Sequence, residues 1–296
     1  MTTDELVVAS WNVKDNGRGT STGARKASSI LADFKPHIVL RQELTDAARN
    51  GGRALYAEAE EIGGLSAFMA ETKKDRSSHP PGIMFDPHLF TTVARADQDM
   101  PWKPICGVQV RLKGCPKPIT LASAHLTHYS HPLRDLEAAR LTVFAERDRA
   151  VLIGLDANSY PHRATDETTD PIDWDDGVED ATHIQHRTVE IDGRRVPHTT
   201  PSRILTGGTK PVFTDLGHHA ATRLGQPGAL AFTASLTRKD QGPPQRIDWI
   251  LGTHDWADAL LGVEVVNTGL EALSDHGLVI ARFDLKAVQK MLTPTG

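Results

Sequence analysis

Six strand-like runs in this sequence end on, contain or directly follow a side chain that can bind a metal ion or move a proton. These side chains are Asn12, Glu43, His125, Asp156, Asp248 and the adjacent pair Asp275 and His276. Any single case has a simple structural explanation, because a polar residue at a strand end commonly caps a turn or accepts a backbone hydrogen bond. Six cases with the same inventory are difficult to explain in that way.

The types of these residues indicate which chemistry they would support. Carboxylate and carboxamide oxygens are ligands for a hard cation such as Mg²⁺, and histidines stabilise charge or transfer protons. In "VLIGLDANSY" (151–160), Asp156 and Asn158 are two residues apart and would therefore face the same way from an extended strand. No Cys/His spacing typical of structural zinc occurs, and no GxxxxGK[ST] phosphate loop is present.

A second group of histidines, the adjacent His218 and His219, is not expected to bind a metal ion. Neighbouring residues on a regular element cannot both face one ion, so we expect them to be surface or loop residues.

The elements that must position these side chains are mainly strands. Apolar runs of strand length rich in Val, Ile and Leu lie near the start and at 37–43, 82–85, 107–112, 119–126, 150–157, 246–251, 263–266 and 277–283. Helix-like stretches at 24–34, 47–62 and 133–147 separate some of them. This mixture predicts mixed sheets covered by helices.

The region 161–210 differs from the rest because it is polar, and we expect an excursion from the core there. Asp192-Gly193 follows the alternating Val189 and Ile191, which predicts a small exposed hairpin. The excursion also holds a basic cluster of Arg187, Arg194, Arg195, His198 and Arg203. Either a solvated hairpin or a clamp for phosphate would explain the cluster, and Arg194, Arg195 and Arg203 are the candidate substrate-binding residues.

The bulk properties limit the class of protein. The 296-residue chain has a formal net charge of −5, so binding of nucleic acid would need a local basic patch. Cys106 and Cys115 could pair across a hairpin, but two cysteines are too few for a disulfide framework, and free thiols in a reducing compartment are expected. With no secretory signal and no apolar run long enough to span a bilayer, we expect a cytoplasmic protein without membrane association.

The same residues carry a family resemblance. The motifs "SWNV" (10–13), "RQE" (41–43), "SAHLTH" (123–128), "GLDAN" (154–158), "RIDWIL" (246–251) and "LSDHG" (273–277) resemble, in order, those of the endonuclease/exonuclease/phosphatase family, the DNase I-like proteins. The resemblance runs from about Val7 to Phe283. It implies an α+β fold, a four-layer αββα sandwich with two mixed sheets face to face and helices outside, formed as one domain over residues 1–296.

The resemblance also implies hydrolysis of a phosphate ester with a divalent metal, Mg²⁺ or Mn²⁺. Glu43 matches the main metal ligand of the family, with Asn12 and Asp275 assisting. One further ligand position of the family, before "GIMF", has no clear match, and Ser78 or His79 is the candidate.

Five residues match catalytic positions. Asp156 would orient and deprotonate the attacking water or bind a second metal, and Asn158 would hold a phosphate oxygen. His276 would lie over the scissile phosphate with Asp248 as its partner, and His125 matches a histidine of the DNase I-like members. A metal, an imidazolium and an amide donor would together stabilise the charge of the transition state.

The sequence departs from the family pattern at two motifs. Arg41 replaces the apolar residue of the usual "LQE", and "LDAN" replaces "GDFN". These departures leave the metal-binding residues in place but alter residues near the substrate.

Three functions remain open from the sequence. The first is a phosphodiesterase or nuclease, with a phosphate-ester substrate that includes nucleic acid as a candidate. The second is a phosphomonoesterase for a small phosphorylated metabolite. The third is a non-catalytic binding module on the same fold, which the complete set of acid-base and metal residues argues against.

Overall fold

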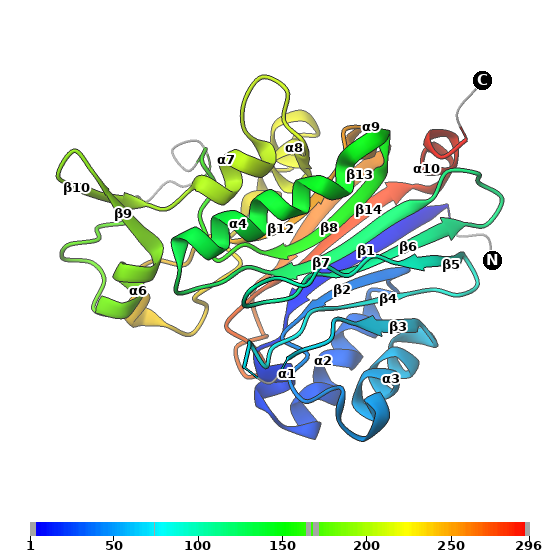
Figure 1. The fold of residues 1–296 in the computed structure, drawn as a ribbon, viewed down its shortest axis with the longest axis horizontal. Coiled ribbons are helices and arrows are strands. Elements are labelled where there is room, and N and C mark those ends of the chain that lie inside the picture. The colour runs from blue at the N-terminus through cyan, green and yellow to red at the C-terminus, as the bar shows by residue number, and fades with distance from the viewer. Residues whose placement is uncertain (1–3, 74, 164–166, 168–171, 294–296) are drawn as a thin grey trace.

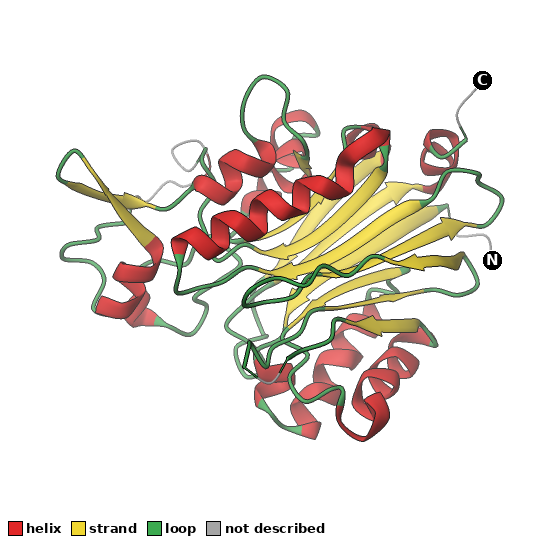
Figure 2. Ribbon diagram, in the orientation of Figure 1, coloured by secondary structure: helices red, strands yellow, loops and turns green. Residues whose placement is uncertain are grey.

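The computed structural model describes residues 4–73, 75–163, 167 and 172–293, and within them two six-stranded sheets form the centre of the molecule. Both sheets are mixed, because β1 pairs with β2 and β7 pairs with β8 in parallel, whereas the other pairs are antiparallel. Figure 2 shows the sheets stacked with helices on their outer sides.

The first sheet has the strand order β13-β14-β1-β2-β4-β3. Its strands are β1 (Glu5–Asn12), β2 (Ile38–Gln42), β3 (Ser66–Met69), β4 (Gly82–Phe85), β13 (Leu260–Val266) and β14 (Leu278–Asp284). The second sheet has the order β11-β12-β8-β7-β6-β5. Its strands are β5 (Phe90–Arg95), β6 (Cys106–Leu112), β7 (Ile119–His125), β8 (Ala150–Asp156), β11 (Thr214–Asp215) and β12 (Asp248–Gly252).

Helices form the two outer layers and the connections between strands. The α-helices are α1 (Asp15–Arg18), α2 (Ser21–Asp33), α3 (Arg49–Gly63), α4 (His131–Thr142), α6 (Ala181–Arg187), α7 (Thr200–Thr206), α8 (Leu216–Arg223), α9 (Asp255–Ala259) and α10 (Leu285–Met291). Short 3₁₀ helices are η1 (Val143–Asp148), η2 (Pro227–Leu230) and η3 (Lys239–Gln241). In Figure 1, α2 and α3 lie below the sheets, and α4 and α7 lie above them.

Three buried clusters show why the chain forms four layers. Alternate residues of β1 point to opposite sides: Leu6 and Val8 enter the core between the sheets, and Val7 and Ala9 pack in the core that contains α2 and α3. On the other side, β8 and α4 share a third core. A strand buried on both faces must be apolar at every position, which explains the continuous apolar runs in the sequence.

These layers confirm the predicted four-layer sandwich. The expected strands and the three expected helices are present, with the third divided into α4 and η1. The sequence analysis missed β3 and β5. In β5, the five residues after Phe90 are exposed, so the strand has no strong apolar pattern. His218 and His219 lie half-buried in α8, not in a loop.

The excursion contains the expected hairpin. β9 (Thr188–Ile191) and β10 (Arg194–Pro197) pair antiparallel, with Asp192 and Gly193 both at positive φ, as a tight two-residue turn requires. Figure 1 shows this hairpin protruding beside α6.

Two further expectations concern the thiols and the membrane. Cys106 and Cys115 are both buried and unpaired, which confirms the free thiols. Among the described residues, no helix has the length and apolar character needed to span a membrane.

Candidate active site

The predicted site residues lie at one end of the core between the two sheets. In β8, Leu152, Gly154 and Asp156 occupy alternate positions on the face toward the first sheet, so the apolar core changes to a carboxylate at the strand end. The glycine at position 154 allows the two sheets to approach closely, because a Cβ there would lie 2.5 Å from the Cβ of Leu40 in the opposite sheet. The close approach of the sheets brings Ser10 and Leu40 of the first sheet against β8.

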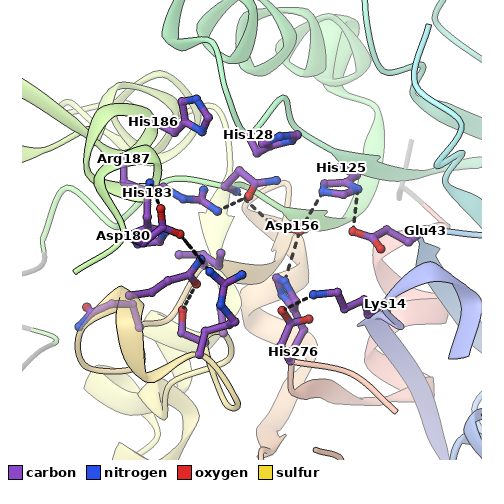
Figure 3. Close-up of a pocket in the computed structure, with 18 of the residues that line it drawn as sticks. Lys14, Glu43, His125, His128, Asp156, Asp180, His183, His186, Arg187 and His276 are labelled. Atoms are coloured by element: carbon purple, nitrogen blue, oxygen red, sulfur yellow. Dashed lines mark hydrogen bonds and ion pairs between the residues drawn. The ribbon is translucent and has the colours of Figure 1, made fainter. Parts of the chain in front are cut away.

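Strand register places three of the predicted residues side by side. Asp156 pairs with His125 of β7 on one side and with Asp248 of β12 on the other. All three side chains are at most 5% exposed. His125 Nε2 lies 3.2 Å from Asp156 Oδ2, and His276 Nε2 lies 3.9 Å from the same oxygen. Figure 3 shows Asp156 between the two histidines.

Asn12 links this carboxylate to Glu43. Its Nδ2 donates to Asp156 Oδ2 at 2.7 Å and to Glu43 Oε1 at 3.2 Å. Glu43 follows directly after β2 in the left-handed region, at φ 58°, and its other oxygen accepts from the Asp15 backbone N–H at 2.8 Å. The Oδ1 atom of Asn12 is buried and has no hydrogen-bond partner among the described residues.

His276 is bound to Asp248 through its other ring nitrogen. Nδ1 lies 2.9 Å and 3.1 Å from the two Asp248 carboxylate oxygens. Burial disfavours the imidazolium, but the carboxylates of Asp248 and Asp156 outweigh burial and raise the pKa of His276 to about 10. Burial raises the pKa of Asp248 to about 6, so at neutral pH the shared proton resides on the imidazole.

Opposite protonation states follow for the two histidines beside Asp156. Burial, together with the nearby Lys103 ammonium, lowers the pKa of His125 well below its usual value, so this imidazole is neutral. Burial also opposes ionisation of Asp156, but the His276 imidazolium and two nearby cations, Lys103 and Arg187, hold its pKa below the usual value. Asp156 is therefore an ionised acceptor between a neutral and a charged ring.

Asp275 lies on the same cavity wall, but it has a cationic partner of its own. Lys14 Nζ lies 3.0 Å from Asp275 Oδ2. Burial would raise the pKa of Asp275, but His276 and Lys14 lower it. The structure thus brings Asn12 and Glu43 into hydrogen-bond contact, whereas Asp275 is occupied by Lys14.

Asn158 lies near two cations that the sequence analysis did not choose as substrate-binding residues: Arg187, which it placed in the basic cluster, and Lys103, which it did not single out. At φ 47° Asn158 is in the left-handed region, and its Nδ2 donates to the Leu126 carbonyl at 2.8 Å. Arg187 donates from Nη2 to Asn158 Oδ1. Lys103 is 3% exposed and donates from Nζ to the same Leu126 carbonyl at 3.4 Å.

A buried arginine on α4 holds this region together. Arg134 has no exposed surface and donates to four backbone carbonyls, those of Thr127, His128, Asn158 and His186. These carbonyls belong to the loop after β7, the turn after β8 and the end of α6. Arg134 therefore positions Asn158 relative to α6, and no local sequence pattern reveals this role.

The cavity between these groups has a volume of about 450 Å³. The excursion contributes one wall through α6 and the residues before it, with Asp180, His183, His186 and Arg187 lining the cavity. The excursion therefore reaches the cavity through α6.

The three candidate arginines are elsewhere. Arg194, Arg195 and Arg203 do not line the cavity. Arg194 is exposed on β10, Arg195 donates to Thr188 Oγ1 at 3.2 Å, and Arg203 donates to Thr199 Oγ1 at 3.4 Å. The reason is the direction of the chain: the hairpin that carries Arg194 and Arg195 projects away from the sandwich, and only the α6 end turns inward.

The unusual Arg41 also lies away from the cavity. It is fully buried on the α3 side of β2, where Nε donates to Glu58 Oε1 at 2.6 Å. Its other nitrogens donate to the carbonyls of Trp11 and Gln42 and to Asn16 Oδ1. Arg41 therefore stabilises the segment after β1 and does not form a substrate wall.

The residues at the Glu43 end of the cavity fit a hard divalent cation. The Asn12 Oδ1 atom has no partner among the described residues, and the same carboxamide contacts the Glu43 carboxylate through Nδ2. Carboxamide and carboxylate oxygens are the ligand types that Mg²⁺ prefers. Asp15, Glu43 and His79 also form a group whose ligand atoms lie within 4.8 Å of one another. His79, one of the two candidates for the unmatched ligand position, is therefore close to Glu43.

Comparisons with known proteins agree with this architecture. The model of the family described as "Endonuclease/Exonuclease/phosphatase family" matches residues 9–276. No curated protein matches the sequence.

Solved structures are similar in fold over nearly the whole chain. An endonuclease/exonuclease/phosphatase protein from Bacteroides vulgatus has a TM-score of 0.63 and 14% identity, covering 95% of this chain and 98% of that one. Truncated TDP2 from Caenorhabditis elegans has a TM-score of 0.61 and 14% identity, with coverage of 95% and 98%. TDP2 from D. rerio, complexed with a single-strand DNA product, has a TM-score of 0.62 and 15% identity, with coverage of 95% and 99%.

Proposed function

The chain belongs to the endonuclease/exonuclease/phosphatase family, and from this membership and the cavity geometry we propose that it is a metal-dependent phosphodiesterase of the nuclease type. Members of this family are phosphoester hydrolases, and most of them depend on a metal. Our proposal adds three points to family membership: a diester substrate, a Mg²⁺ or Mn²⁺ ion, and the roles of individual residues.

One arrangement carries the proposal. Asp156 Oδ2 is within 2.7 Å of Asn12 Nδ2 and 3.2 Å of His125 Nε2, and His276, bound to Asp248, is 3.9 Å away. An ionised carboxylate beside a protonated imidazole supplies both an acceptor for a water proton and a donor for a phosphate oxygen. A binding module would not need both groups in one buried cavity.

The proposed residue roles follow from the protonation states. His276 Nε2–H donates to a non-bridging phosphate oxygen, while Asp248 fixes the tautomer by accepting from Nδ1–H. Asp156 orients the attacking water and accepts its hydrogen bond. Asn158 presents its remaining Nδ2–H to a phosphate oxygen, and the neutral His125 holds Asp156 in place.

Asn12 and Glu43 are the residues that would hold the divalent cation, with Asp275 available once Lys14 moves away. When bound, such an ion supplies positive charge that stabilises the phosphate oxygens in the transition state.

The choice of a diester substrate follows the relatives, because the D. rerio TDP2 structure contains a single-strand DNA product. A single-stranded nucleic acid is therefore the first substrate to test. The chain's formal net charge of −5 argues against a long non-specific contact with duplex DNA, since such contacts depend on many phosphate-neutralising cations.

A substrate panel tests this proposal. The purified protein is assayed with Mg²⁺ or Mn²⁺ on plasmid DNA, single-stranded DNA, RNA, bis-p-nitrophenyl phosphate and p-nitrophenyl phosphate. We expect turnover of the diesters, loss of turnover with EDTA, and loss of metal-dependent activity in Glu43→Gln with the fold retained. Turnover of the monoester alone would assign a phosphomonoesterase, and unchanged Mn²⁺ binding by calorimetry in Glu43→Gln would refute the metal assignment.

A further inference from the structure

Lys103 is a buried cation without an ionic partner. Among the described residues, no carboxylate oxygen lies within 4.0 Å of its ammonium group, although the side chain is only 3% exposed. Its ammonium group donates a 3.4 Å hydrogen bond to the Leu126 carbonyl. The buried Arg41 and Arg246 differ, because each contacts a buried carboxylate directly. An unpaired buried charge destabilises a fold unless a ligand compensates it.

Arg187 has the same property on the opposite side of Asn158. Its Nη2 donates to the Asn158 amide oxygen, and its Nη1 is buried with no partner among the described residues. No carboxylate of the described chain forms an ion pair with it within 4.0 Å. The neighbouring Asp180 does not compensate this charge, since its carboxylate contacts Arg238 at 3.0 Å and caps α6.

These two cations are connected through the Asn158 side chain and the Leu126 carbonyl. Lys103 and Asn158 both donate to the Leu126 carbonyl, and Arg187 donates to the Asn158 side chain, so a continuous series of contacts connects the cations. Both cations line the cavity, and Arg134 fixes the backbone of Asn158 between them. Figure 3 shows Arg187 on the wall formed by α6, across the cavity from Lys14 and Glu43.

The surrounding imidazoles add donors but no charge. Burial, with the positive charges of Lys103 and Arg187 adding to it, lowers the pKa of His128 to about 4. Burial, with Arg187 adding to it, likewise lowers the pKa of His183 to about 4. Burial also lowers the pKa of Lys103 to about 8, so the ammonium form still predominates at neutral pH. The cavity wall around Asn158 therefore has two positive charges, an amide and neutral rings, which is a suitable environment for a tetrahedral oxyanion.

We propose that Lys103 and Arg187, together with the Asn158 amide, form a phosphate-binding subsite in the part of the cavity around Asn158. The guanidinium supplies paired N–H donors for phosphate oxygens and the ammonium supplies a point charge. The subsite binds a phosphate group either as the diester itself or as a free phosphate, and it rests on the proposed function for its role in catalysis. Because both cations are positively charged, the subsite favours substrates with a negatively charged group beside Asn158.

The test measures binding of inorganic phosphate to metal-free protein in EDTA by calorimetry. We expect Lys103→Met and Arg187→Gln each to weaken binding on the order of 10-fold or more, as loss of one charge-assisted hydrogen bond predicts. Arg187→Lys, which keeps the charge but not the planar donors, should lie between wild type and Arg187→Gln. Lys113→Met and Arg111→Gln are matched controls, because both residues are exposed at the far end of β6, and they should bind phosphate as wild type does.

A stability measurement separates a binding role from a structural one. In phosphate-free buffer, Lys103→Met should raise the melting temperature, because the variant removes an uncompensated charge. At the same phosphate concentration, added phosphate should raise the melting temperature of wild type more than that of Lys103→Met.

Equal phosphate affinity in wild type and both variants, or no phosphate binding by wild type, would overturn the subsite. A second comparison, with bis-p-nitrophenyl phosphate as the ligand, shows whether a diester uses the same cations. These results are independent of turnover: a wild-type protein that binds phosphate through Lys103 and Arg187 but hydrolyses no ester would support the subsite and refute the proposed function.

Discussion

The substitution Asp248→Asn tests whether the Asp248–His276 pair keeps the imidazole charged. The carboxylates around His276 raise its pKa from 6.5 to about 10 despite burial, a change of about 3.5 units that corresponds to roughly 5 kcal/mol in favour of the imidazolium. Removing the partner at 2.9 Å leaves burial, which lowers the pKa, and Asp156, which raises it. Loss of one adjacent opposite charge should lower the pKa by about 1–3 units.

The titration is measured on metal-free protein by NMR of ¹³Cε1-labelled histidine. Wild-type His276 should remain protonated through pH 9, whereas in Asp248→Asn it should titrate roughly between pH 7 and 9. The alkaline limb of the kcat/KM profile on bis-p-nitrophenyl phosphate should move to lower pH in the same direction. Asp255→Asn, which changes an exposed carboxylate outside the cavity, is the control.

Stability should follow the same linkage. Because the folded-state pKa of His276 is above its unfolded value of 6.5, the stabilisation is complete below pH 6.5 and is lost as pH rises through about 10. Asp248→Asn should therefore reduce the loss of unfolding free energy between pH 7 and 10. An unchanged midpoint of His276 in this variant would refute the reasoning and leave the contact as a structural hydrogen bond between strands.

Two further predictions concern buried arginines. Arg41→Leu should lower the unfolding free energy by about 3–5 kcal/mol in urea titrations, because Glu58 would remain buried without a partner. The double variant Arg41→Leu/Glu58→Leu should recover most of this loss, and equal stability of the single and double variants would contradict the reasoning. Arg134→Met should lower the unfolding free energy on the order of 3 kcal/mol, since several backbone carbonyls lose their donor. Arg134→Lys should recover little, because one ammonium cannot reach carbonyls in three segments, and full recovery would show that only the charge matters.

The sequence by itself determined the strands and the residues at their ends. A strand buried on both faces needs continuous apolar residues, so β1, β7 and β8 are visible as runs, and polar residues such as Asn12, His125 and Asp156 mark where these runs end. The Asp192-Gly193 turn was also predictable, because the positive φ angles of a tight hairpin select these residue types. The four-layer fold was predicted from the family resemblance, which rests on motifs that occur in a fixed order along the sequence.

Tertiary structure alone decided which charges meet. Arg187 contacts Asn158, which is 29 residues away in the sequence, and Asn12 contacts Asp156, which is 144 residues away. No local sequence pattern predicts contacts between residues so far apart. Arg187, Arg194 and Arg195 belong to one basic cluster in the sequence, yet α6 turns only the first of them into the cavity, while the hairpin carries the other two outward. Lys103 had no distinguishing neighbours in the sequence, because its contact with the Leu126 carbonyl joins residues that are 23 positions apart.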